Sequence, residues 1–162
     1  MDRAAHARLL LTYEGWANQR ILSNLFDLDE DEPAVGPSWG TIFGSMAHVV
    51  ASHAVWLGRF KETGHSFAIP ATLPEMEAAF RRSQAELVAF GADLVDHDWE
   101  RLVRFNDSRG HPHEEFLGVL LTHLVNHGTY HRGEAALLLT RAGRSPGDLD
   151  LIVYRRQQEP GR

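Results

Sequence analysis

Hydrophobic residues recur every three or four positions over four long stretches of the chain, which is the period of amphipathic α-helices. The predicted helices cover residues 3–27, 38–61, 72–96 and 113–142. Ser38 and Thr72 are typical N-cap residues for the second and third helices, and Gly143 stops the fourth. Four helices of this length predict one all-α domain over residues 1–162, folded as a four-helix bundle.

The segments between these helices are shorter and more polar. Residues 27–37 and 64–71 are predicted to be connections. Residues 99–105 alternate as a strand does and are followed by a turn over 106–110, which predicts a short β-hairpin near residues 100–112. An apolar run over residues 149–154 precedes a polar C-terminal end that we expect to fray.

Composition narrows the range of functions. The chain has no cysteine, which excludes disulfides and thiolate ligands and fits the reducing cytoplasm, where we expect the protein. Because no apolar run approaches twenty residues, we expect no contact with a membrane. The net charge of −6, with scattered Lys and Arg, argues against a nucleic-acid partner. Ten histidines in 162 residues indicate metal chemistry.

Two of these histidines, His127 and His131, are four residues apart on the apolar face of the fourth predicted helix. A buried polar group without a partner costs about 1–3 kcal/mol, so each must either find a hydrogen bond in the core or bind a metal. Imidazoles at this spacing project side by side and can share one ion. His123 lies at the edge of the same face and is predicted to be a pocket residue.

A stable metal site needs a third ligand, and the second predicted helix offers two. His53 lies in the centre of the bulky apolar stripe, as periodicity alone would favour. His48 lies on a flank with Ser52 and Arg59, a position that suits a metal open to a polar cleft. The pattern of the residues does not decide between the two histidines.

Four short blocks of the sequence resemble the DinB-like (YfiT-like) family of metal-dependent enzymes, in the order that the family has them. The blocks are Tyr13-Glu14-Gly15-Trp16-Ala17-Asn18, Met46-Ala47-His48-Val49-Val50 with Trp56-Leu57-Gly58-Arg59, Asn126-His127-Gly128-Thr129-Tyr130-His131-Arg132-Gly133-Glu134, and Asp148-Leu149-Asp150-Leu151-Ile152-Val153-Tyr154. The resemblance implies a four-helix bundle that binds a divalent metal through His48, His127 and His131. Two positions depart from the pattern: Tyr130 stands where many relatives have a histidine, and Glu134 where many have glutamine.

Three neutral imidazoles would leave coordination positions open for water or substrate, as in catalytic metal sites. Zinc and nickel are the leading candidates for the metal, and iron and cobalt also fit. The family resemblance implies transfer of a low-molecular-weight thiol, or hydrolysis, with a small molecule as substrate. Arg59 is a candidate for binding an anionic substrate, and no residue of the sequence presents itself as a general base.

Two alternatives to an enzyme remain at this stage. The chain could be a non-catalytic metal-binding or stress-response bundle that acts through a partner, or a bundle with core histidines and no metal. A strip of small residues on the second predicted helix would suit either a homodimer, which we expect, or internal packing; it comprises Gly44, Ala47, Ala51, Ala54 and Gly58.

Overall fold

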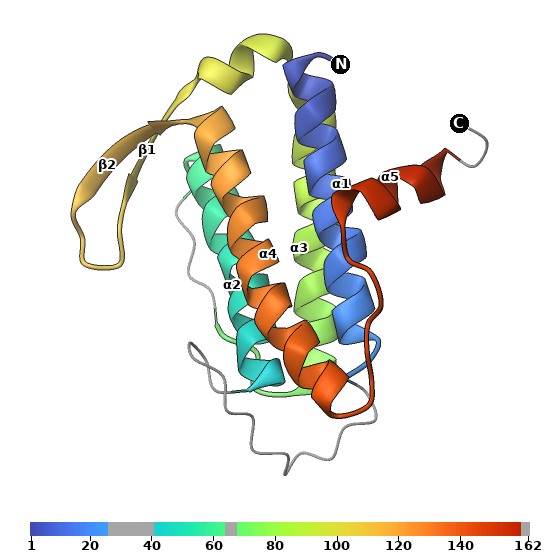
Figure 1. The fold of residues 1–162 in the computed structure, drawn as a ribbon. Helices are drawn as coiled ribbons and strands as arrows, with labels where there is room; N and C mark the ends of the chain where they lie inside the picture. Colours follow the sequence, from blue (N-terminus) through green and yellow to red (C-terminus); the bar gives the residue numbers. More distant parts are fainter. Residues whose placement is uncertain (26–40, 64–67, 160–162) are drawn as a thin grey trace.

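The four predicted helices form a bundle, with a small hairpin at one end (Figure 1). The computed structural model describes residues 1–25, 41–63 and 68–159. The bundle helices are α1 (Arg3–Leu22), α2 (Ile42–Lys61), α3 (Leu73–Asp93) and α4 (Leu117–Arg141). Helices α1 and α2 each pack against both α3 and α4. The all-α prediction with a small hairpin is therefore confirmed.

Side chains that cap the helices set where they begin. Asp2 accepts a hydrogen bond from the backbone of Ala5 at the start of α1, and Thr72 accepts one from Glu75 at the start of α3, as predicted. Helix α2 is capped by Thr41, and the predicted cap Ser38 lies outside the described residues. Helix α1 ends at Leu22, earlier than the predicted residue 27. The chain there changes to tighter turns, in which the amides of residues 24 and 25 bond carbonyls three positions back.

The hairpin lies between α3 and α4 and corrects two predicted boundaries. Strand β1 (Leu102–Asn106) pairs antiparallel with β2 (Pro112–Phe116), so that Leu102 faces Phe116. The predicted strand began at residue 99, but Trp99 lies in a 3₁₀ helix, η1 (Asp96–Glu100). Residues 113–116, predicted to be helical, form β2 because their backbone groups pair with β1. Phe116, which the apolar periodicity of the fourth predicted helix would place on its buried face, is the last residue of β2 and is 47% exposed.

The C-terminal segment returns along α1 and ends in a short helix, α5 (Leu151–Gln158), where fraying was predicted. Tyr154 of α5 packs between Tyr13 and Trp16 of α1, at ring centroid distances of 6.1 and 5.4 Å. The Tyr13 hydroxyl also donates a hydrogen bond to the carbonyl of Leu149. The predicted connection 27–37, and residues 64–67 of the second connection, lie outside the described residues.

The core contains an apolar cluster near the hairpin, another near the opposite end, and buried charge between them. Glu14, Asn18, His53 and Arg132 are all at most 2% exposed and bond to one another. Below, these four residues are called the buried polar network. None of the described helices combines the length and the apolar character needed to cross a membrane.

Candidate metal centre

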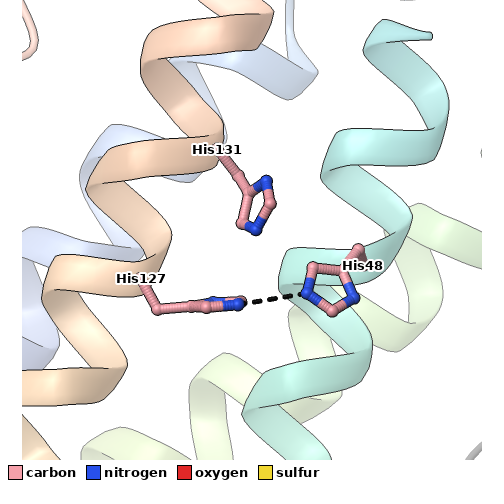
Figure 2. Close-up of side chains that lie close together, drawn as sticks. All are labelled: His48, His127 and His131. Carbon is pink, nitrogen blue, oxygen red and sulfur yellow. Dashed lines mark hydrogen bonds between the residues drawn. The ribbon is translucent and has the colours of Figure 1, made fainter. Parts of the chain in front are cut away.

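Three imidazoles converge between α2 and α4, about halfway along the bundle. His127 and His131 project from successive turns of α4, and His48 projects toward them from α2 (Figure 2). One ring nitrogen from each residue lies within 4.8 Å of the others. His131 is buried, and the other two are partly exposed. The structure therefore brings together the three residues that the family resemblance implied.

The spacing of these nitrogens fits a single metal ion. The Nε2 atoms of His48 and His127 are 3.1 Å apart. Two imidazole nitrogens bound to one tetrahedral zinc at the usual Zn–N distance would be about 3.3 Å apart. Imidazole is a good ligand for zinc, copper, iron and nickel, so a set of three histidines accommodates a divalent transition metal.

The surroundings favour the uncharged imidazole that a metal requires. Burial, together with the neighbouring rings of His131, His48 and His123, lowers the pKa of His127 to about 4. Burial also lowers the pKa of His48, and His131 adds to this effect. A neutral ring has a lone pair to donate, whereas a protonated ring repels a cation. At neutral pH, His48 and His127 are therefore ready to bind an ion without first losing a proton.

The carboxylate of Glu134 orients the third ring. Its Oε2 lies 3.1 Å from Nδ1 of His131, and both side chains are about nine-tenths buried. Since a carboxylate only accepts hydrogen bonds, Nδ1 carries the proton in this pair and Nε2 is left to bind a metal. Such carboxylate–histidine–metal arrangements fix the ring and raise its basicity.

His53, the other candidate for the third ligand, belongs to the buried polar network instead. Its Nε2 lies 3.2 Å from Oε1 of Glu14, and the residue is 1% exposed. The same carboxylate oxygen bonds Asn18 at 3.2 Å and pairs with Arg132 at 2.6 Å. The central position of His53 in the apolar stripe was therefore a sign of burial in the core and not of metal binding.

A pocket of about 770 Å³ opens beside the three histidines. His48 and His127 line it, together with Ser52 and Arg59, as the flank of α2 predicted. The remaining lining residues are mostly apolar or lie on the hairpin; they are Ala51, Val55, Trp56, Ile69, Phe105, Asp107, Ser108 and His113. His123 is outside this lining, but its ring lies 5.1 Å from that of Trp56 and 5.7 Å from that of His127.

Comparison with known proteins agrees with this arrangement. The family model described as "DinB family" matches residues 1–162. The chain belongs to the DinB family. It is also similar to "Protein DinB" of Bacillus subtilis (strain 168), with 27% identity over an alignment that covers 90% of this chain and 91% of that protein. No solved structure gave a match. The DinB family is metal-binding in general, in keeping with the three-histidine cluster.

Several residues of this DinB-family site could not be assigned a role from the sequence. His113 is an exposed residue of β2 that lines the pocket, lies 3.2 Å from Asp107 and stacks on Phe105. His113 reaches the pocket because β2 pairs with β1, whereas the predicted hairpin ended at residue 112 and the predicted helix began at residue 113. Glu134 did carry a signal, because it lies three residues after His131 on the same helix.

Proposed function

We propose that this DinB-family protein is an enzyme that uses a divalent metal, zinc or nickel first, held by His48, His127 and His131. Its substrate is a small molecule, and the leading reaction is transfer of a low-molecular-weight thiol to an electrophile, with hydrolysis as the second. The observation that carries the proposal is the convergence of three imidazole nitrogens within 4.8 Å at the edge of a pocket.

Different residues of the chain would bind the metal, orient its ligands and line the substrate pocket. The three histidines would hold the ion, and the contact of Glu134 with Nδ1 of His131 leaves Nε2 of that ring available as a ligand. Ser52 lies one turn after His48 on α2 and lines the same pocket. The aromatic rings of Trp56 and Phe105, 5.3 Å apart, exclude water from part of the pocket wall.

A divalent metal bound there would supply Lewis acidity, which lowers the pKa of a bound water to about 7 or stabilises a thiolate. In thiol transfer, the sulfur forms a bond to a carbon of the electrophile, and the leaving group departs with the bonding electrons. The thiol proton passes to solvent. A three-histidine site leaves room for such a ligand, because structural zinc sites instead fill all four positions with protein side chains.

The experiment is elemental mass spectrometry of untagged protein, comparing wild type with His127→Ala. We expect close to one equivalent of metal in the wild type and almost none in the variant. His123→Ala is the matched control, since it removes a neighbouring histidine of α4 that is not among the three and should retain the metal. Equal metal in wild type and His127→Ala would overturn the assignment of the site.

Turnover is tested next, with the metal-loaded protein and pairs of small thiols and electrophiles. If the wild type forms a thioether product and His127→Ala does not, the result supports the proposal that the protein is a metal-dependent enzyme. If the metal is retained and neither thiol transfer nor hydrolysis occurs, the non-catalytic alternative, a metal-binding bundle that acts through a partner, takes its place.

A further inference from the structure

Arg59 is held at the pocket wall by contacts that fix its position while leaving most of its hydrogen-bond donors unused. Its guanidinium carbon lies 4.4 Å from the ring centroid of Trp56 and 4.7 Å from that of Phe105. Its terminal Nη2 donates to the carbonyl of Asn106 at 3.0 Å. A guanidinium has five N–H donors, and within the described residues this is the only hydrogen bond that Arg59 makes.

The nearby carboxylate of Asp107 does not occupy those donors. Its Oδ1 accepts from the backbone amides of Arg109 and His111 at 2.8 and 2.9 Å. Its Oδ2 lies 3.2 Å from Nδ1 of His111 and 3.2 Å from Nε2 of His113. Asp107 therefore organises the turn of the hairpin, whereas Arg59 presents a positive charge to the pocket that the metal centre adjoins.

We propose that Arg59 binds a carboxylate on the substrate, at the end of the molecule opposite the group that reaches the metal. The inference deepens the proposed function and rests on it. The planar fork of an arginine matches a carboxylate, and its charge makes those hydrogen bonds stronger than neutral ones. Stacking on two aromatic rings holds the fork in place before the substrate arrives.

The positions on α2 give the length of this substrate. His48 and Arg59 are eleven residues apart, which corresponds to about 16 Å along the helix axis. Both side chains lean toward the N-terminus of the helix, and the longer Arg59 reaches further than His48, so the gap is somewhat shorter than this rise and, after the bonds at its two ends, leaves roughly 10 Å for the ligand. Ala51, Val55 and Trp56 lie between the two positions on α2 and line the pocket, which suits an apolar chain or ring.

The substrate class is therefore a small carboxylic acid with an apolar middle and a metal-binding group at its far end. A matched pair of probes is 8-mercaptooctanoate and 8-mercaptooctanamide, which share the thiol and the chain and differ in charge. A shorter acid, 3-mercaptopropionate, cannot span the distance. Binding of each to zinc-loaded protein is measured by calorimetry, and the metal content of the same samples is determined.

In the wild type we expect 8-mercaptooctanoate to bind about tenfold tighter than 8-mercaptooctanamide. We expect 3-mercaptopropionate to bind no tighter than 3-mercaptopropionamide. Arg59→Gln should abolish the preference while leaving the affinity for 8-mercaptooctanamide unchanged, and Arg59→Lys should keep part of it. Arg104→Gln is the control: it removes an arginine from the neighbouring strand, where it pairs with Glu114 outside this pocket, and should keep the full preference.

Equal binding of acid and amide by the wild type, or a preference that survives in Arg59→Gln, overturns the proposal. If Arg59→Gln does not fold, the wild-type comparison decides together with Arg59→Lys, in which a preference as large as that of the wild type overturns the proposal. If the protein binds no zinc, the proposed function fails on the metal measurement. Octanoate and octanamide, titrated into the metal-free protein, then test Arg59 separately, with the same preference expected and its absence counting against the proposal.

Discussion

Gly128 follows His127 on α4 and lies directly against the buried polar network. A Cβ atom at this position would clash with Oε1 of Glu14 and lie 2.7 Å from a guanidinium nitrogen of Arg132. Glu14 and Arg132 are fully or almost fully buried, so neither can swing into solvent. The absent side chain is therefore what lets the ion pair form beside the metal centre.

Gly128→Ala should lower the free energy of unfolding by roughly 2–3 kcal/mol, because the extra methyl forces a buried ion pair apart. Gly133→Ala is the matched control on the same helix, since a Cβ there meets no atom within 4 Å. It should raise the free energy of unfolding by about 0.5–1 kcal/mol through helix propensity. Both are measured by urea denaturation, and equal effects of the two variants would contradict the argument.

Glu134→Gln tests the carboxylate that bonds His131. The amide can still bond the ring but lacks the charge that raises its basicity, so we expect zinc affinity to fall by about tenfold. The measurement is competition with a chelator at constant pH. Glu77→Gln removes a carboxylate from a surface ion pair on α3 and should leave the affinity unchanged. Wild-type affinity in Glu134→Gln would show that the hydrogen bond does not tune the metal.

The buried polar network joins three helices of the bundle at the same level along its axis. Glu14 and Asn18 come from α1, His53 from α2 and Arg132 from α4. Burial alone would raise the pKa of Glu14, but the adjacent Arg132 and His53 outweigh it and hold that pKa below 4.5. The ionised carboxylate therefore stabilises the folded chain at neutral pH.

This pKa predicts how stability depends on pH. As the pH falls below about 4.5, the unfolded chain takes up the Glu14 proton before the folded chain does, so the free energy of unfolding decreases. Glu14→Gln should cost about 3 kcal/mol at pH 7 and should show a smaller acid-induced loss than wild type. Urea denaturation between pH 7 and pH 3 measures both. Parallel curves for the two proteins would contradict a stabilising charge at this position.

The sequence predicted the features that depend on nearby residues of the chain and missed those that depend on distant ones. Helical periodicity is local, so it found the four bundle helices and the His127/His131 pair. The choice between His48 and His53 depends on the Glu14 carboxylate of α1, which is buried and lies beside His53, and the periodicity of α2 does not report a partner on another helix. Residues 113–116 joined β2 because of a partner strand about ten residues earlier, which a local pattern does not report.

The C-terminal helix α5 packs against α1, on the side of the bundle away from the metal centre (Figure 1). Tyr154 is 8% exposed and packs against Tyr13 and Trp16, whereas Ile152 on the same helix is 54% exposed. The predicted homodimer gains no support from the small-residue strip, because Ala47, Ala51 and Gly58 are buried inside the chain. The homodimer stays a prediction.

Tyr154→Ala should lower the free energy of unfolding by about 3 kcal/mol, the usual cost of removing a buried aromatic side chain. Ile152→Ala, in the same helix, should change it by less than about 0.5 kcal/mol because its side chain is exposed. Thermal or urea denaturation measures both changes. Metal content should be the same in the two variants and in wild type, and loss of metal from Tyr154→Ala would show that α5 supports the site.

Helix α1 contributes no ligand, yet through Glu14 it fixes the spacing of the two helices that do. Because the buried polar network holds α2 and α4 in place independently of the three imidazoles, we expect little of the free energy of metal binding to be lost to ordering the chain. A chelator should then empty the site and leave the helical circular dichroism intact, unlike a zinc finger, which unfolds without its metal. Such a scaffold would exchange one ion for another while folded, and we expect the metal bound there to follow the supply of ions around it and the intrinsic affinity order of imidazole sites.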